Sequence, residues 1–401
     1  MIIQPKIRGY ICTTAHPIGC AAHVQEQIDY VRRQKPVKNG PKRALIIGAS
    51  TGYGLSSRIV SAFGGSRAAT IGVFFEKGYE EKRTATAGWY NSVAFERKAK
   101  EDGLYVKSFN GDAFSDEMKK KVVHSIKKDL QTIDFLVYSM AAPRRLNPRT
   151  GQLAKSILRP IENAFTEKSI DLSNYKLEMV TLPPAMADEI KETVSVMGGE
   201  DWQFWVDLLE RENVLAHGFK TVAYSYVGPQ ITHKIYRQGT IGRAKDHLEA
   251  TALELNERLK KIAGRALISV NKALVTQSSS AIPFIPLYYI LLRKVMQGKN
   301  LDEDCIEQIY RLFSTAVYSD NIPVDEKGFI RMDEFELRKD VQAEVCANWD
   351  KLTDKNLREL SDLDGYHKEF LKLFGFGIKG VNYDADVEPD QEIPSIIRNP
   401  E

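Results

Sequence analysis

The chain has 401 residues, of which 43% are hydrophobic and 27% charged, so it can form a globular core and does not resemble disordered, collagen-like or coiled-coil sequences. Its 56 Lys and Arg against 53 Asp and Glu leave a net charge of +3 with no long block of one sign, which argues against a dedicated nucleic-acid binder. The four cysteines form no C-x-x-C pair, and the most apolar stretch, residues 281–292, is too short to span a membrane. We therefore expect reduced thiols, no metal site, no membrane span and a cytoplasmic location.

Short apolar runs typical of buried parallel strands alternate with helical stretches over the first two thirds of the chain. Strands are expected at residues 43–48, 69–75, 104–109, 133–139, 220–227 and 266–270, and helices at residues 54–63, 89–102 and 116–130. This alternation predicts an α/β fold with a doubly wound parallel sheet, which is the Rossmann, short-chain-dehydrogenase-like arrangement.

Further elements are expected outside these strands. Residues 1–15 could form a small hairpin, followed by a helix at residues 21–33. Apolar residues at steps of three and four predict one amphipathic helix over residues 245–262. After residue 276 the chain is charged and helical, and helices are expected at residues 286–296, 302–313, 333–348 and 354–374.

A glycine-rich loop follows the first predicted strand and leads into a helix. It reads Gly48-Ala49-Ser50-Thr51-Gly52-Tyr53-Gly54, a G-x-x-x-G-x-G spacing. Glycines permit a tight turn, and a helix N-terminus offers free N–H groups and the positive end of its dipole to a pyrophosphate. Between a strand and a helix, this spacing is typical of the dinucleotide loop of short-chain dehydrogenases, and no G-K-[ST] follows as in Walker-type nucleotide hydrolases.

The ends of the next three strands carry further candidate cofactor residues. These are Phe75 and Glu76, Asp112 and Ala113, and Met140 and Ala141. Doubly wound folds bind ligands at the edge where the carboxyl ends of the strands meet. Glu76 can accept hydrogen bonds from ribose hydroxyls and would repel a 2′-phosphate, which favours NAD(H) over NADP(H). The alternative is that these carboxylates bind no ligand, and this alternative is stronger for Asp112 than for Glu76.

Tyr236 and Lys245 form the candidate catalytic pair. They are nine residues apart, and nine steps of about 100° on one ideal helix would place them on opposite faces. Tyr236 must therefore precede the regular helix, in a segment that contains Gly239 and Gly242. From the start of that helix, Lys245 could reach the nicotinamide ribose and lower the pKa of Tyr236 by its charge.

Together these residues carry a resemblance to a known family. Alongside Tyr236-x8-Lys245 and the glycine loop stand five further runs: Thr86-Ala-Gly-Trp-Tyr90, Ala141-Ala-Pro-Arg-Arg145, Met197-Gly-Gly-Glu-Asp-Trp202, Val270-Asn-Lys-Ala-Leu-Val-Thr276 and Glu336-Leu-Arg-Lys-Asp-Val341. Over nearly its whole length the chain resembles the FabV-type enoyl reductases, also called trans-2-enoyl-CoA reductases.

The resemblance implies a metal-free enzyme that uses NADH to saturate the trans-2 double bond of an enoyl-CoA or enoyl-acyl-carrier-protein thioester, as in fatty acid synthesis. It makes Tyr236 the proton donor, Lys245 a cofactor ligand and Tyr226 a contact of the substrate thioester. It places NADH against Gly48, Ala49, Ser50, Thr51, Gly52, Tyr53, Phe75, Glu76, Asp112, Ala113, Met140, Ala141, Lys245, Leu274, Val275 and Thr276. We also expect a monomer.

Two other functions fit part of the pattern. A carbonyl reductase could use the same tyrosine and lysine to protonate a ketone oxygen, and a non-catalytic NAD-binding sensor would need only the glycine loop. Residues 281–292 could wall an acyl chain or form a buried core helix. The basic run Arg144, Arg145, Arg149, Lys155 and Arg159 could meet CoA phosphates or an acidic carrier protein, although a solvated face is favoured.

All the candidate cofactor and catalytic residues must converge on one ligand, although more than 220 residues separate the first from the last. We therefore expect a single elaborated domain over residues 1–401. It would comprise an N-terminal addition (1–40), a cofactor-binding core (41–276) with an insert (143–219), and a helical extension (277–401) that shapes the acyl site.

Overall fold

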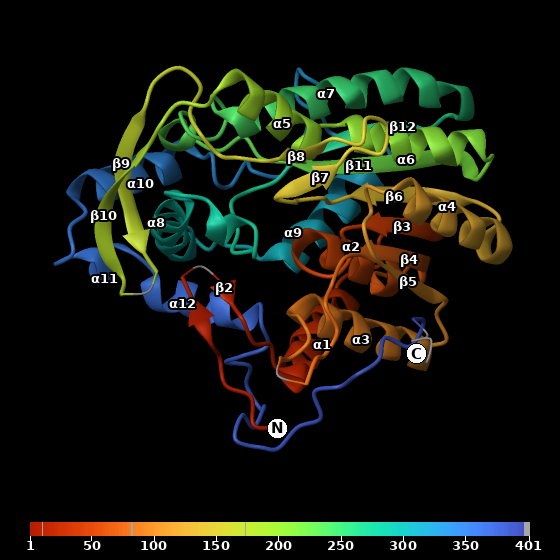
Figure 1. Ribbon diagram of the computed structural model, residues 1–401, viewed down its shortest axis with the longest axis horizontal. Helices are drawn as coiled ribbons and strands as arrows, with labels where there is room; N and C mark the ends of the chain where they lie inside the picture. Colours follow the sequence, from red (N-terminus) through yellow and green to blue (C-terminus); the bar gives the residue numbers. More distant parts are fainter. Residues whose placement is uncertain (10, 82, 173, 397–401) are drawn as a thin grey trace.

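A parallel seven-stranded sheet forms the centre of the computed structural model, which describes residues 1–9, 11–81, 83–172 and 174–396 (Figure 1). The strand order is β13-β12-β11-β6-β3-β4-β5, and every neighbouring pair is parallel. The strands are β3 (Arg43–Ile47), β4 (Ala69–Phe74), β5 (Val106–Asn110), β6 (Ile133–Tyr138), β11 (Leu215–Ser225), β12 (Arg265–Val270) and β13 (Ile330–Arg331). The chain winds outward from β3 in both directions, which confirms the predicted doubly wound fold.

The six predicted strands are all present, and the sheet contains one more. β11 begins at Leu215, earlier than predicted, and ends at Ser225, so Tyr226 lies just beyond the strand. The additional strand, β13, was not predicted because two residues carry no readable alternation. It pairs with Ser269 and Val270 of β12 and brings the C-terminal part of the chain to the sheet edge.

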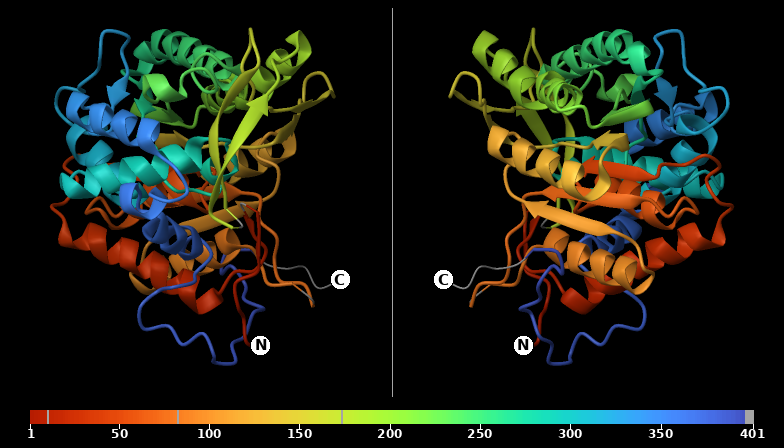
Figure 2. Two further views of the ribbon diagram at one scale, coloured as in Figure 1. Left: turned by 90° about the vertical axis from the view of Figure 1, so that its left-hand side faces the viewer. Right: turned by 90° about the vertical axis from the view of Figure 1, so that its right-hand side faces the viewer.

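Two helical layers cover the sheet. Along β3, Ala44 and Ile46 face one core, and Leu45 and Ile47 face the other. The first core packs against α1 (Pro17–Arg33), α2 (Gly52–Phe63), α3 (Ala87–Glu101) and the C-terminal helices, and the second against α4 (Asp116–Ser125), α6 (Glu200–Arg211) and α7 (Thr240–Leu259) (Figures 1 and 2). None of the helices in the described ranges is long and apolar enough to cross a membrane.

The N-terminal segment contains the predicted hairpin, formed by β1 (Ile7–Arg8) and β2 (Ile11–Cys12). The helix after it, α1, starts at Pro17, four residues before the predicted start. Proline is tolerated in the first turn, and the His16 side chain accepts a hydrogen bond from the Gly19 N–H at 3.1 Å. The predicted start missed this cap because histidine is not a usual N-cap residue.

The insert contains two antiparallel hairpins and two helices, α5 (Ala187–Met197) and α6, that the sequence did not predict. One hairpin pairs β7 (Arg144–Leu146) with β8 (Leu153–Lys155), and the other pairs β9 (Phe165–Asp171) with β10 (Lys176–Leu182). The second hairpin lies at the left of Figure 1, and α5, which follows it, packs against α7. Residue 173 of the insert and residues 397–401 of the extension lie outside the described residues.

The extension is helical, as predicted, but two of its boundaries differ. It contains α8 (Ile285–Gly298), α9 (Cys305–Leu312), α10 (Lys339–Lys351), α11 (Leu357–Leu360) and α12 (Leu363–Lys372). The helix predicted from residue 333 starts only at Lys339, because the preceding turn directs Asp333 and Glu336 inward. The single helix predicted over residues 354–374 was wrong: Ser361 is extended, and Asp362 starts a new helix by accepting a hydrogen bond from Gly365 N–H.

Residues 389–395 run along α3 and are called the strap. Trp89 donates to the Gln391 carbonyl, and Tyr90 donates to the Pro389 carbonyl, each at 2.7 Å. At the end of the strap, Ser395 donates through its backbone N–H and its hydroxyl to the fully buried carboxylate of Glu96. The Ser395 hydroxyl also accepts a hydrogen bond from the N–H of Ser108 in β5. The strap therefore joins the last described residues to the outer strand of the sheet.

Candidate functional site

The glycine loop joins the end of β3 to α2 at the carboxyl edge of the sheet. Gly48 and Gly52 have φ values of 85° and 52°, which favour glycine. A Cβ atom at Gly48 would collide with the Ser139 carbonyl at the end of β6, and one at Gly54 would collide with the Gly48 carbonyl. These close approaches bring the N-terminus of α2 against the loop, so the residues fit a bound pyrophosphate. The Thr276 methyl lies 3.6 Å from the position that a Cβ of Gly52 would take, so the structure brings the end of the 274–276 segment to the same loop.

Glu76 is held against this loop by its neighbours. Its carboxylate accepts a hydrogen bond from the Ser50 hydroxyl at 2.6 Å, and its backbone N–H donates to Asn110 Oδ1 at 2.7 Å. A Cβ at Gly88, in the first turn of α3, would overlap the Glu76 carboxylate. Burial raises the pKa of Glu76, although its hydrogen bond with Ser50 acts in the opposite direction. The site thus fits the sequence expectation of a carboxylate beside the adenosine ribose.

The other predicted cofactor residues also lie at the carboxyl edge. The Phe75 ring is 76% exposed directly beyond β4, where it is free to contact a flat ligand. Ala113 is buried beyond β5, and Met140 and Ala141 follow β6. The Asp112 carboxylate accepts a hydrogen bond from the Phe114 N–H at 2.9 Å, which is the loop-carboxylate arrangement that the sequence left open.

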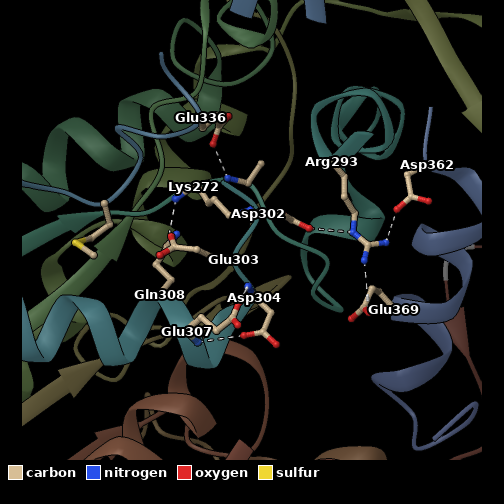
Figure 3. A network of polar contacts seen from close by, with 12 residues as sticks. Lys272, Arg293, Asp302, Glu303, Asp304, Glu307, Gln308, Glu336, Asp362 and Glu369 are labelled. Carbon is tan, nitrogen blue, oxygen red and sulfur yellow. Dashed lines mark hydrogen bonds and ion pairs between the residues drawn. The ribbon is translucent and has the colours of Figure 1, made fainter. Parts of the chain in front are cut away.

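Tyr53 faces away from the loop. Its hydroxyl lies 3.0 Å from both the Lys272 carbonyl and Gln308 Oε1 and donates its one proton to either, so it links α2 to the C-terminal extension. Leu274 and Val275 are buried and line a cavity of about 180 Å³ behind the site. The rest of that cavity is mainly acidic and is lined by Asp302, Glu303, Asp304, Glu307 and Glu369. Arg293 also lines it and pairs with Asp302, Asp362 and Glu369 (Figure 3). Such a cavity repels phosphate groups, so only its Leu274 and Val275 wall belongs with the cofactor residues.

Tyr236 lies before α7, as its spacing from Lys245 required. Its ring meets that of Tyr226 edge to face, with centroids 4.9 Å apart and an interplanar angle of 85°. Tyr236 is 9% exposed, and burial raises the pKa of its hydroxyl. No hydrogen bond from the described part of the chain reaches the Tyr236 hydroxyl, so its proton is available to a ligand.

Lys245 reaches the end of β11 from the second turn of α7. Its ammonium donates to the Tyr224 carbonyl at 3.1 Å. Burial lowers the pKa of Lys245 to about 8, and the Glu249 carboxylate partly opposes this shift. The expected lowering of the Tyr236 pKa by Lys245 is not found in this structure, because the burial of the phenol dominates and raises that pKa instead.

The structure adds a buried carboxylate, Glu336, to which the sequence assigned no function. It lies between β13 and α10, is 0% exposed, and accepts a hydrogen bond from the Tyr226 hydroxyl at 2.9 Å. A phenol has one proton, so Tyr226 offers a substrate only its oxygen lone pairs while this bond is made. The expected contact of Tyr226 with the substrate thioester can therefore include a hydrogen bond donated by Tyr226 only if the bond to Glu336 breaks.

The basic run after β6 is not a free cationic surface. Arg145 is buried and pairs with Glu200 at 2.7 Å, Arg149 pairs with Asp116 at 3.2 Å, and Arg159 pairs with Glu189 at 2.8 Å. Among the five basic residues, these three are paired with carboxylates of the same chain, and Arg149 stays exposed. The idea of a continuous patch for CoA phosphates or a carrier protein is therefore not supported by the structure.

The parallel sheet carries a glycine loop after β3, the Glu76 carboxylate after β4 and the Tyr236–Lys245 pair beyond β11. Together these features define a nicotinamide-dependent oxidoreductase of the Rossmann class. The chain belongs to the trans-2-enoyl-CoA reductase family. Residues 83–318 match the trans-2-enoyl-CoA reductase catalytic region, and residues 2–81 match the NAD(P)H binding domain of trans-2-enoyl-CoA reductase.

Individual relatives agree over the full length. The chain is 52% identical over 396 residues to trans-2-enoyl-CoA reductase [NADH] of Ruminiclostridium cellulolyticum, covering 99% of this chain and 100% of that one. It is 54% identical over 404 residues to enoyl-[acyl-carrier-protein] reductase [NADH] of Coxiella burnetii, covering 100% and 99%. The crystal structure of Clostridium acetobutulicum trans-2-enoyl-CoA reductase in complex with NADH superposes with a TM-score of 0.95 at 47% identity, covering 97% of this chain and 98% of that one.

Residues 324–387 match a third family description, the enoyl reductase FAD binding domain. Within these residues, β13 and helices α10 to α12 form no strand–glycine loop–helix unit. A Cβ at Gly328, Gly377 or Gly380 would meet nothing within 4 Å, so these glycines form no close-packed phosphate loop of the kind at Gly48. The segment does not fit a flavin dinucleotide.

Proposed function

We propose that this chain reduces the trans-2 double bond of enoyl thioesters with NADH, and that Tyr236 and Lys245 carry the chemistry. NADH supplies a hydride to the β-carbon of the enoyl thioester. The negative charge that develops on the thioester oxygen is stabilised by the Tyr236 hydroxyl, whose proton is free to be donated. The proton that ends on the α-carbon comes from Tyr236 or from solvent.

The observation that carries this proposal is the position of the Tyr236 hydroxyl. The Tyr236 side chain is buried beside Tyr226 at the sheet edge that also carries the glycine loop, and its hydroxyl uses no described protein group as a hydrogen-bond partner. Lys245 reaches the end of β11, where its ammonium can hold the nicotinamide ribose. Glu76, beside Ser50, favours NADH over NADPH because its carboxylate would repel a 2′-phosphate.

An apolar cluster next to Tyr236 suits the acyl chain. Ile235, Phe284 and Ile285 are buried together, and Leu158, Phe165, Val180, Leu182 and Ile282 pack against them from the insert and the extension. Phe284 has a φ of 68°, an uncommon conformation for a bulky residue, at the start of α8. Most of α8 is buried in the first of the two cores that flank the sheet, so its first turn is the part that can meet a substrate.

The thioester carrier, location and assembly state belong to the same proposal. Both CoA and acyl-carrier-protein thioesters are kept as substrates, in line with the names of the relatives. A cytoplasmic location is supported by Cys12 and Cys20, which are buried free thiols. The single-domain prediction is supported by one apolar core that contains residues from Ile3 to Ile393. A monomer is proposed, and light scattering after size-exclusion chromatography tests it.

The function is tested by following NADH absorbance with crotonyl-CoA and then with acetoacetyl-CoA. Oxidation of NADH with crotonyl-CoA is the expected result. Turnover of acetoacetyl-CoA alone would identify a carbonyl reductase, and NADH binding without any turnover would identify a cofactor sensor.

A further inference from the structure

Glu336 connects three parts of the site through one carboxylate. Its Oε1 accepts hydrogen bonds from the hydroxyls of Tyr226 at 2.9 Å and Tyr288 at 2.8 Å, and its Oε2 accepts one from the Ala273 N–H at 2.7 Å. These donors come from the end of β11, from α8 and from the segment after β12. Figure 3 shows Glu336 beside the backbone that carries Lys272.

Two of these bonds act on groups that the proposed reaction uses. Tyr226 packs against the ring of Tyr236, and Ala273 directly precedes the 274–276 segment proposed to line the NADH site. Gly228 leaves room for this phenol, because a Cβ there would lie only 2.8 Å from the Tyr226 hydroxyl oxygen. The phenol can therefore approach the backbone at Gly228 closely, and Glu336 fixes it at its tip.

We propose that Glu336 is a positioning residue, which holds Tyr226 against Tyr236 and directs the Tyr226 proton away from the substrate. Tyr236 is then the sole phenolic donor to the thioester oxygen. The C-terminal extension contributes to the reaction through this carboxylate, although Glu336 itself touches neither substrate nor cofactor. The inference rests on the proposed function.

Glu336→Gln alters the bond from Tyr226 and can keep the bond from Ala273. The amide oxygen can keep the bond from Ala273 N–H, whereas the amide NH₂ reverses the bond to Tyr226 and removes the charge that strengthened it. We expect kcat with crotonyl-CoA to fall about tenfold, with the dissociation constant of NADH unchanged. Glu336→Ala loses all three bonds, so kcat should fall further and NADH should bind more weakly.

The decisive measurement is the coupling between Glu336 and Tyr226. If Glu336 acts through Tyr226, Glu336→Gln has little further effect on kcat in a protein that already carries Tyr226→Phe. Equal fold-losses of kcat in the presence and absence of Tyr226→Phe would overturn the proposal, as would a wild-type kcat for Glu336→Gln. Wild-type turnover of crotonyl-CoA is measured first, so a failure of the proposed function is seen separately from a failure of the coupling.

Glu96→Gln is the matched control. Glu96 is also 0% exposed and also accepts several hydrogen bonds, but it lies in α3 beside the C-terminal strap. Glu96→Gln should lower the melting temperature and leave kcat unchanged, which separates the cost of altering a buried carboxylate from an effect on the reaction.

If Glu336→Gln does not fold, Tyr226→Phe and Tyr288→Phe are compared instead. Each deletes one phenolic bond to the same oxygen of Glu336. A larger fall in kcat for Tyr226→Phe supports the proposal, and equal losses overturn it.

Discussion

The buried ammonium of Lys245 should weaken the folded protein at neutral pH. Its side chain is 8% exposed, and burial lowers its pKa from the usual 10.5 to about 8. Because the unfolded chain binds this proton more tightly, the charge costs the folded state about 3 kcal/mol at pH 7. The cost shrinks as the pH rises through 8 and disappears above 10.5.

Lys245→Met removes the charge and keeps a side chain of similar length. The unfolding free energy of the wild type should therefore increase by about 1 kcal/mol relative to Lys245→Met between pH 7 and pH 9. Urea denaturation of both proteins without cofactor at the two pH values measures this difference. The offset at pH 7 also contains the hydrogen bond to the Tyr224 carbonyl, so only its change with pH is diagnostic. A difference that stays constant, or that moves in the opposite direction, would refute the assignment of a lowered Lys245 pKa.

Three further outcomes follow from the described contacts. Tyr236→Phe should reduce kcat about 10²- to 10³-fold and leave the NADH dissociation constant, measured by fluorescence titration, unchanged; full activity would remove Tyr236 from the mechanism. Glu76→Ala should raise the ratio of NADPH to NADH activity. Gly88→Ala should raise this ratio more weakly, because its new methyl group displaces the Glu76 carboxylate without removing it. Unchanged ratios would contradict the role of Glu76. Asp201→Ala should lower the unfolding free energy by about 3–5 kcal/mol, because Lys119, 2.7 Å away, then keeps a buried charge without its partner; a loss below about 1 kcal/mol in urea denaturation would argue against this.

The sheet and much of the site could be predicted from the sequence because local patterns encode them. Ala44 to Ile47 are apolar on both faces, as a strand covered by two helical layers requires. The glycine loop and Glu76 lie directly after strands, so the parallel arrangement brings them together once the strands are recognised. The irregular segment before α7 followed from the nine-residue spacing of Tyr236 and Lys245.

The remainder depends on contacts between residues far apart in the sequence. Glu336 stands in a run already noted for its resemblance, but its three donors come from positions 226, 273 and 288. The raised pKa of Tyr236 depends on burial, which spacing does not reveal. Charge composition could not show that Arg145 lies inside the protein, because its partner Glu200 lies 55 residues away in the chain.

The strap at the end of the chain has a consequence for association with other chains. A sheet normally exposes unpaired N–H and C=O groups along its outer strands, and these can recruit a strand from another molecule. Here the N–H of Ser108, the central residue of β5, is already bonded to the Ser395 hydroxyl. At the opposite edge, β13 is only two residues long. A side-chain cap at one edge and a very short strand at the other both disfavour edge-to-edge aggregation of the central sheet.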